Sequence, residues 1–444
     1  MLRFGTDGVR GDADKELTTP LVVALARAVA RVLQPERVVI GRDTRESGPR
    51  IESELAAGLR REGVEPVLLG VLPTPAIAYV AANDGVPAAI VSASHNRWSD
   101  NGVKVIGADG RKLPDDVEVA IESALEAELA TSGAGVHTYG SGDIDFDADG
   151  PSADAYVSHL LPTLDGRRLD DLDVVLDCAN GAGFDVGPRV LRAAGARVHV
   201  LHAAPDGRNI NDNCGSTYPE ELCRVVRERG AALGLALDGD GDRVLAVDER
   251  GTLIDGDQIM TMTAIDMHSR RELRNDAIAV TVMSNLGLRR ALRTEGIGVV
   301  ETQVGDRHVV AAMQEHDLVL GGEQSGHIVY AQYATTGDGL LTGLRIIDLL
   351  RRTGRPLSAL AGQMTHVPQV LVNIRVAQRV DVSASAVLDA AVKELEAELG
   401  ETGRVLVRAS GTEPLVRVMI EADRQSVADA AAERLRQVVT SQFA

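Results

Sequence analysis

The sequence places a serine directly after a short apolar run. Residues 88–91, Ala-Ala-Ile-Val, predict a buried strand, and Ser-Ala-Ser-His-Asn follows at 92–96. Ligands of open α/β sheets lie beyond the carboxyl ends of the strands, so Ser94 is a candidate for a reactive group. A Ser/Asn turn that merely ends the strand explains these residues equally well. The other polar clusters of the chain must decide between the two interpretations.

A second cluster, Asp-Gly-Asp-Gly-Asp-Arg at 238–243, alternates three carboxylates with glycines between two apolar runs. Carboxylate oxygens suit a hard cation, and three protein ligands leave positions open, as Mg²⁺ requires when it acts on phosphates. An EF-hand is the rival, because Glu249 falls at its twelfth position, but Arg243 replaces the required glycine. A solvated acidic turn would leave three carboxylates repelling one another. The loop therefore predicts a Mg²⁺ site formed by Asp238, Asp240 and Asp242.

Two further clusters provide groups that bind sugars and phosphates. Gly-Glu-Gln-Ser-Gly-His at 322–327 combines a carboxylate, an amide, a hydroxyl and an imidazole, which suits a polyol, although a polar turn is the alternative. Arg-Ala-Ser-Gly-Thr-Glu-Pro at 408–414, followed by Arg417, offers guanidinium groups, hydroxyls and a glycine backbone to an anion. The glycine-rich segment 181–187 departs by one residue from the dinucleotide fingerprint, so a nucleotide-dependent enzyme is disfavoured.

The composition excludes several classes of protein. A chain of 444 residues predicts two to four domains, and its net charge of −19 argues against generic binding of nucleic acids or anionic membranes. There is no apolar run of membrane-spanning length and no signal-peptide core. The three cysteines, at positions 178, 214 and 223, show no CxxC spacing, so reduced thiols and a cytoplasmic location are expected.

A strand–helix–strand order recurs three times along the chain. Each helix ends with an arginine three residues before a glycine, in the pairs Arg60/Gly63, Arg192/Gly195 and Arg293/Gly296. Glycine at that place predicts a left-handed helix terminus. The pattern indicates three similar α/β domains followed by a smaller C-terminal α+β domain, with a linker at 130–151. The predicted domains are 1–150, 151–250, 251–365 and 366–444.

Together with Phe-Gly-Thr-Asp-Gly-Val-Arg-Gly at 4–11, these clusters resemble the α-D-phosphohexomutase family across essentially the whole chain, in the family's order and spacing. The resemblance implies mixed sheets and four domains around a central cleft. It also implies interconversion of glucosamine 6-phosphate and glucosamine 1-phosphate, a step towards UDP-N-acetylglucosamine. Phosphomannomutase or phosphoglucomutase activity is the alternative, with Gln324 favouring the amino sugar. A non-catalytic phosphosugar-binding protein is the alternative from another class.

The same resemblance assigns roles to residues. Phosphorylated Ser94 would donate its phosphoryl group to the sugar phosphate, recover one from the resulting bisphosphate, and complete the ligands of one Mg²⁺ per chain. The catalytic group would comprise Arg10, Ser94, His95, Lys104, Arg243 and His327. The sugar hydroxyls and the second phosphate would be held by Glu323, Ser325, Arg408, Ser410, Gly411, Thr412 and Arg417. Since successive strand residues point to opposite faces, His95 is not expected to act directly on Ser94.

One residue of the nucleophile segment departs from the family. The family usually has proline after Ser-His-Asn, and this chain has Arg97, which would loosen the backbone and add charge next to the reacting phosphate. Two hypotheses explain the first phosphorylation of Ser94, namely autocatalysis and an activator, glucosamine 1,6-bisphosphate. The expected partner is a small phosphosugar, with no nucleic acid and no membrane. Monomer and homodimer both stay open.

Overall fold

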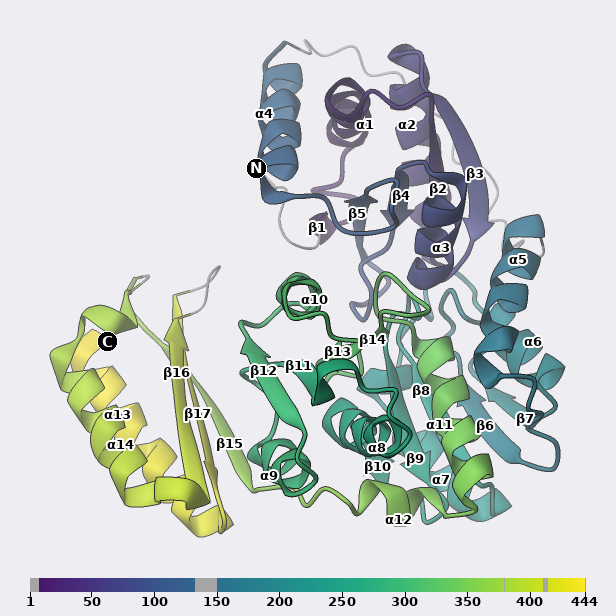
Figure 1. Ribbon diagram of the computed structural model, residues 1–444. Coiled ribbons are helices and arrows are strands. Elements are labelled where there is room, and N and C mark those ends of the chain that lie inside the picture. The colour runs from purple at the N-terminus through teal and green to yellow at the C-terminus, as the bar shows by residue number, and fades with distance from the viewer. Residues whose placement is uncertain (1–7, 132–149, 379, 410–413, 444) are drawn as a thin grey trace. The chain divides into compact units, whose positions relative to one another are not determined.

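The computed structural model describes residues 8–131, 150–378, 380–409 and 414–443. The backbone divides into two compact units. The larger comprises Met1–Met283 and Ile297–Gly362, and the smaller comprises Ser284–Gly296 and Gln363–Ala444. Within the described ranges the larger unit contains three sheets and the smaller unit one, as the strand labels of Figure 1 show. None of the helices in these ranges combines the length and the apolar character needed to cross a bilayer.

The first sheet has the strand order β1-β5-β4-β2-β3. Its strands are β1 (Val9–Asp12), β2 (Arg37–Arg42), β3 (Glu65–Val71), β4 (Ala88–Val91) and β5 (Asp100–Ile106). Strand β2 runs parallel to β3 and β4, whereas β5 is antiparallel to β4 and β1, so the sheet is mixed. The helices of this part are α1 (Thr19–Leu33), α2 (Gly48–Arg61), α3 (Thr74–Asp84) and α4 (Asp115–Thr131). Apolar side chains of α1, α2 and α4 share one core with the sheet.

The second sheet has the order β10-β9-β8-β6-β7. Its strands are β6 (Asp173–Asp177), β7 (Arg197–Leu201), β8 (Leu233–Leu237), β9 (Val244–Asp248) and β10 (Leu253–Ile254). Its helical segments are α5 (Pro151–Leu160), η1 (Leu161–Leu164), α6 (Val186–Ala193), η2 (Gly215–Thr217) and α7 (Glu220–Arg229). All residues of β8 are buried, as expected of a continuous apolar run in a strand that is covered on both faces.

The third sheet has the order β12-β11-β13-β14. Its strands are β11 (Ala277–Thr281), β12 (Gly298–Thr302), β13 (Leu320–Gly322) and β14 (Ile328–Tyr330). The helical segments are α8 (Gly256–Ser269), η3 (Arg274–Asp276), α10 (Asp306–Glu315), α11 (Gly339–Thr353) and α12 (Leu357–Ala361).

The three sheets share one topology. In each, a strand (β2, β6 or β11) pairs in parallel with two neighbours, and one neighbour (β4, β8 or β13) continues into an antiparallel partner. The repeat that the sequence predicted is therefore confirmed, and so are the left-handed glycines, with φ of +78° at Gly63, +108° at Gly195 and +74° at Gly296. The turns after β4, β8 and β13 occupy equivalent places, and each carries one predicted chemical cluster.

The smaller unit is an α+β structure. Its sheet has the order β15-β17-β16, all antiparallel, with β15 (Gln369–Arg375), β16 (Gly403–Ala409) and β17 (Leu415–Ala422). Its helical segments are α9 (Leu286–Thr294), η4 (Val382–Ala384), α13 (Ala386–Leu399), η5 (Gly400–Thr402) and α14 (Gln425–Phe443). Apolar residues of α13, α14 and the sheet form its core. The predicted C-terminal fold is confirmed, while most of the predicted linker at 130–151 lies outside the described residues.

Candidate functional site

Ser94 lies in the turn that follows β4, and its side chain is buried. The backbone of Ser94 is left-handed, with φ of +52°, which costs a residue with a Cβ about 1 kcal/mol. Its N–H donates to Ser92 Oγ at 2.9 Å, and the Ser92 hydroxyl in turn donates to Asp43 Oδ2 at 2.6 Å. These bonds hold the strained turn in place, so the serine is presented in one conformation.

Two side chains from other segments hold the carbonyl groups of this turn. Arg45 Nη2 donates to the carbonyls of Ser94 (3.1 Å) and Asn96 (2.7 Å), and its Nη1 pairs with Asp43. Asn211 Nδ2 donates to the same two carbonyls at 2.9 and 3.0 Å. Sequence reasoning missed both residues. The polar run that ends β2 was a usable signal for Arg45, because β2 lies beside β4, but nothing marked Asn211.

The predicted metal loop forms the turn between β8 and β9 and directly contacts Ser94. The Ser94 hydroxyl donates to Asp238 Oδ2 at 2.6 Å. Thr74 Oγ1 and Lys104 Nζ donate to Asp240 Oδ2 at 2.8 and 3.0 Å. The loop packs so closely that a Cβ at position 239 would lie 2.5 Å from the Ser94 carbonyl oxygen, which explains the glycine there. The structure thus brings together the serine, the acidic loop and Lys104.

The electrostatics of the three aspartates fit a bound cation. Burial, reinforced by the charges of Asp242 and Asp240, raises the pKa of Asp238 well above its usual range. Burial also opposes ionisation of Asp240, but the charge of Lys104 and the hydrogen bonds around the carboxyl together lower its pKa. The Oδ1 atoms of Asp240 and Asp242 are buried and accept no hydrogen bond within the described ranges. Because the oxygens of the triad lie within 4.8 Å of one another, it can hold a metal ion.

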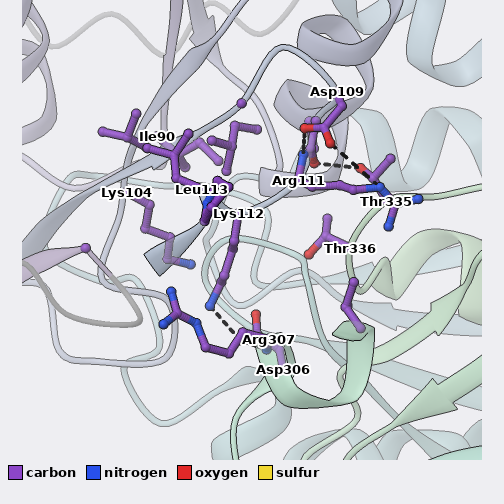
Figure 2. Close-up of a pocket in the computed structure, with 18 of the residues that line it drawn as sticks. Ile90, Lys104, Asp109, Arg111, Lys112, Leu113, Asp306, Arg307, Thr335 and Thr336 are labelled. Atoms are coloured by element: carbon purple, nitrogen blue, oxygen red, sulfur yellow. Dashed lines mark hydrogen bonds and ion pairs between the residues drawn. The ribbon is translucent and has the colours of Figure 1, made fainter. Parts of the chain in front are cut away.

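His327 lies buried between two carboxylates. Its Nδ1 is 3.5 Å from Asp242 Oδ2, its Nε2 is 3.8 Å from Asp306 Oδ2, and the backbone N–H of Gly337 points at Nε2 from 3.1 Å. Burial lowers the pKa of His327, but the carboxylates around it, Asp242 foremost and then Asp306 and Glu323, together raise it overall. Asp306, at the start of α10, also pairs with Lys112 (Figure 2), with 2.5 Å between Oδ1 and Nζ.

A cavity of about 450 Å³ adjoins this side of the site, and its size is typical of small-ligand pockets. Figure 2 shows the cationic ends of Lys104, Lys112 and Arg307 converging at its edge. Lys112 pairs with Asp306, and Arg307 pairs with Asp115. Lys104 likewise pairs with Asp240, and Glu118 is a second partner of Arg307, so carboxylates already balance the charge of these cations.

His95 approaches Ser94, which differs from the prediction. His95 Nδ1 lies 3.4 Å from Ser94 Oγ and 3.3 Å from Arg243 Nη1. The expectation that the two side chains diverge was wrong because it applied strand alternation to a turn: β4 ends at Val91, and Ser94 is left-handed. Burial and the charges of Arg243 and Arg10 lower the pKa of His95. A neutral imidazole beside the serine can accept a proton.

The third cluster forms the turn between β13 and β14. Glu323 Oε1 accepts the backbone N–H of Gly305 at 3.1 Å, and Ser325 Oγ donates to Glu323 Oε2 at 3.2 Å. Gln324 Nε2 donates to Asp255 Oδ2 at 3.1 Å, and Asp255 caps helix α8. The Gln324 amide therefore secures the start of a helix, which gives it a structural function that the sequence did not suggest.

Arg408 and Arg417 lie opposite each other on β16 and β17 of the smaller unit. Burial, together with the charge of Arg417, lowers the pKa of Arg408. Like charges directly opposite each other destabilise a sheet, and a bound anion would relieve this repulsion. The other members of the cluster, Ser410, Gly411 and Thr412, lie outside the described residues.

Arg97 stands at the surface of the nucleophile segment. Its side chain is 74% exposed, and its Nε lies 3.3 Å from Asp100 Oδ1. The neighbouring Trp98 ring packs under the guanidinium of Arg208 at 5.1 Å. Arg97 therefore forms an ion pair with Asp100.

Four family models match the chain. They are described as phosphoglucomutase/phosphomannomutase α/β/α domain I (residues 1–132), domain II (154–251), domain III (255–367) and C-terminal domain (371–438). A phosphoglucosamine mutase of Salinispora tropica is 48% identical over 443 residues, covering 98% of both chains. A phosphoglucosamine mutase of Frankia alni is 50% identical over 450 residues, covering 98% of this chain and 97% of the relative.

Solved structures show the same fold. A phosphoglucomutase/phosphomannomutase family protein of Burkholderia thailandensis superimposes with a TM-score of 0.78 at 25% identity, covering 98% of this chain and 96% of the other. An N-acetylphosphoglucosamine mutase of Aspergillus fumigatus, solved with GlcNAc-6P and magnesium, superimposes with a TM-score of 0.68 at 19% identity, covering 99% of this chain and 96% of the other.

Proposed function

Because the chain belongs to the phosphoglucomutase/phosphomannomutase family, we propose that it is a phosphoglucosamine mutase, which interconverts glucosamine 6-phosphate and α-D-glucosamine 1-phosphate. Near-full-length relatives named phosphoglucosamine mutase, at 48–50% identity, support this substrate. The observation that carries the chemistry is the buried Ser94 hydroxyl, which donates to Asp238 of the acidic triad at 2.6 Å. This arrangement suits a phosphate carrier whose charge is neutralised by its surroundings.

The proposed reaction proceeds in two phosphoryl transfers. The bond between phosphorus and Ser94 Oγ breaks while a bond from phosphorus to a sugar hydroxyl forms, and the hydroxyl proton passes to a nearby base. The resulting glucosamine bisphosphate reorients, and its other phosphoryl group returns to Ser94. Such transfers depend on positioning and on charge neutralisation more than on covalent chemistry. His95 and His327 are the candidates for moving the proton.

Three aspartates and the serine would hold one Mg²⁺. All donors of this set are oxygens, and among the described residues the buried Oδ1 atoms of Asp240 and Asp242 accept no hydrogen bond. Both features fit a hard cation. When bound, Mg²⁺ would offset negative charge on the transferring phosphoryl group. Lys104 already contacts Asp240, and Arg243 lies beside Asp242, so both would place positive charge around the same group.

The ends of the substrate would be held by two other clusters. Glu323 and Ser325 would accept and donate hydrogen bonds to the sugar hydroxyls. The second phosphate would bind Arg408 and Arg417, whose mutual repulsion it relieves, together with Ser410, Gly411 and Thr412.

Replacing Arg408 by alanine tests this phosphate anchor. A charge-assisted hydrogen bond contributes about 1.5–3 kcal/mol, so kcat/KM for the sugar phosphate is expected to fall roughly 10- to 100-fold. Arg375→Ala is the matched control, because Arg375 is an exposed arginine on β15 of the same sheet. Equal kinetic constants in the two variants would rule out the anchor.

Coupled assays on the 6-phosphates of glucosamine, glucose and mannose test the proposed substrate. We expect glucosamine 6-phosphate to give the highest kcat/KM. Higher values for glucose or mannose 6-phosphate would instead indicate a phosphoglucomutase or phosphomannomutase. Tight binding of all three without turnover would identify a phosphosugar-binding protein and contradict the proposal.

A further inference from the structure

A second group of metal-ligating side chains lies at the carboxyl edge of the second sheet. Asp177 is the last residue of β6, His202 follows β7, and Cys214 precedes η2. A carboxylate oxygen, an imidazole nitrogen and the sulfur of these residues all lie within 4.8 Å of one another. Asp177 and Cys214 are buried, whereas the His202 side chain is 23% exposed and opens the group to solvent. None of the three belongs to the proposed reaction.

Neighbouring groups hold two of these side chains in fixed positions. His202 Nδ1 faces Asp177 Oδ2 at 3.1 Å, and its other nitrogen, Nε2, lies 3.2 Å from Glu221 Oε2. Ligating histidines almost always give their second N–H to a carboxylate, which orients the ring. Backbone N–H groups of Ala179 and Gly215 donate to the two Asp177 oxygens at 2.9 Å each, which fixes the carboxylate as well.

The donor set selects a borderline cation and disfavours Mg²⁺. Thiolate and imidazole ligands suit Zn²⁺ or Co²⁺, whereas Mg²⁺ takes oxygen donors. Three protein ligands leave a fourth tetrahedral position for water. Cysteine binds a metal as the thiolate, so a bound cation would displace the proton of Cys214 to solvent.

The loops that carry this group also hold the nucleophile turn. The N–H of Asn211 bonds the carbonyl of Ala179, and the Asn211 side chain donates to the carbonyls of Ser94 and Asn96. The Thr44 hydroxyl donates to the Asn180 carbonyl at 2.6 Å. A cation that joins β6, β7 and the segment before η2 would therefore stabilise the loops that hold the turn containing Ser94.

We propose that Asp177, His202 Nδ1 and Cys214 Sγ form a second cation site, of the Zn²⁺ class, that braces the loops supporting the nucleophile turn.

Cobalt is the probe for this site, because Co²⁺ bound to a thiolate absorbs in the near ultraviolet through sulfur-to-metal charge transfer. The full-length protein is titrated with Co²⁺ in excess Mg²⁺, which occupies the all-oxygen loop. We expect a charge-transfer band that saturates at one Co²⁺ per chain. The band should be lost in Cys214→Ser and retained in Cys223→Ser, since Cys223 lies on α7 outside the group.

Substitutions at two partly exposed residues test the proposal independently if Cys214→Ser does not fold. His202→Gln should abolish the band, and Glu221→Gln should weaken Co²⁺ binding about 10- to 100-fold, because Glu221 orients the ring. Zn²⁺ should also raise the thermal midpoint of the wild type and of Cys223→Ser, but not of His202→Gln. No band in the wild type, or an undiminished band in His202→Gln or Cys214→Ser, would overturn the proposal.

Discussion

Ser94→Ala is expected to lose the covalent phosphate and to lower kcat on the order of 10⁴-fold or more, because both transfers of the proposed reaction use this hydroxyl. Alanine keeps the backbone and removes only the hydroxyl that donates to Asp238. The thermal midpoint should therefore change little. Intact mass spectrometry before and after phosphatase treatment measures the phosphate, and a coupled assay measures the turnover.

Ser99→Ala is the matched control for this experiment. Ser99 lies in the same connection between β4 and β5, and among the described residues its hydroxyl makes only a long contact of 3.5 Å with Asp100. This variant should retain both the phosphate and the activity. If Ser94→Ala retains normal turnover, or if the phosphate lies on another residue, the phosphoserine mechanism fails.

Asp240→Asn is expected to lower kcat roughly a thousandfold. The variant removes one charge from the proposed Mg²⁺ ligands, and metal stabilisation of phosphoryl transfer contributes several kcal/mol, at 1.36 kcal/mol per factor of ten. It also replaces the carboxylate that accepts from Lys104 and Thr74 with a neutral amide. The activity loss should be accompanied by a loss of Mg²⁺-dependent thermal stabilisation, which is measured without substrate.

Asp248→Asn provides the comparison for this second effect. Asp248 is also a buried aspartate of the second sheet, but its Oδ1 accepts backbone N–H groups of the turn after β9. Asp248→Asn should retain both the Mg²⁺-dependent rise in thermal midpoint and the activity. A thermal midpoint of Asp240→Asn that rises with Mg²⁺ as much as that of the wild type would show that the triad does not bind the cation.

The order of elements was accessible from the sequence because it depends on local patterns. Apolar runs, helix-terminal glycines and the repeated strand–helix–strand order correctly indicated three similar α/β parts and an α+β part. Polar residues directly after strands correctly marked the turns after β4, β8 and β13. The pattern of burial along an element and the backbone preferences of its residues show within a few neighbouring positions, so these features can be recognised in the sequence.

Local sequence patterns gave a wrong prediction for His95 and did not identify the residues that hold the nucleophile turn. Alternation along a strand does not apply to a turn, and the left-handed φ of Ser94 redirects the chain. Arg45 and Asn211 hold the nucleophile turn, although Asn211 is 117 residues from Ser94 in the sequence. Asp306 begins helix α10 and also approaches His327.

The sequence contained the chemical groups of this protein: a serine, an acidic triad, a cluster with carboxylate, amide, hydroxyl and imidazole groups, and paired arginines, each near a strand end. Only the tertiary structure decided which groups meet. Ser94 and Asp238 are 144 residues apart, yet they share a hydrogen bond of 2.6 Å, and Lys104 reaches Asp240 across 136 residues. The physical reason is that residue periodicity reports burial along one element, whereas distances between loops follow from how whole sheets pack.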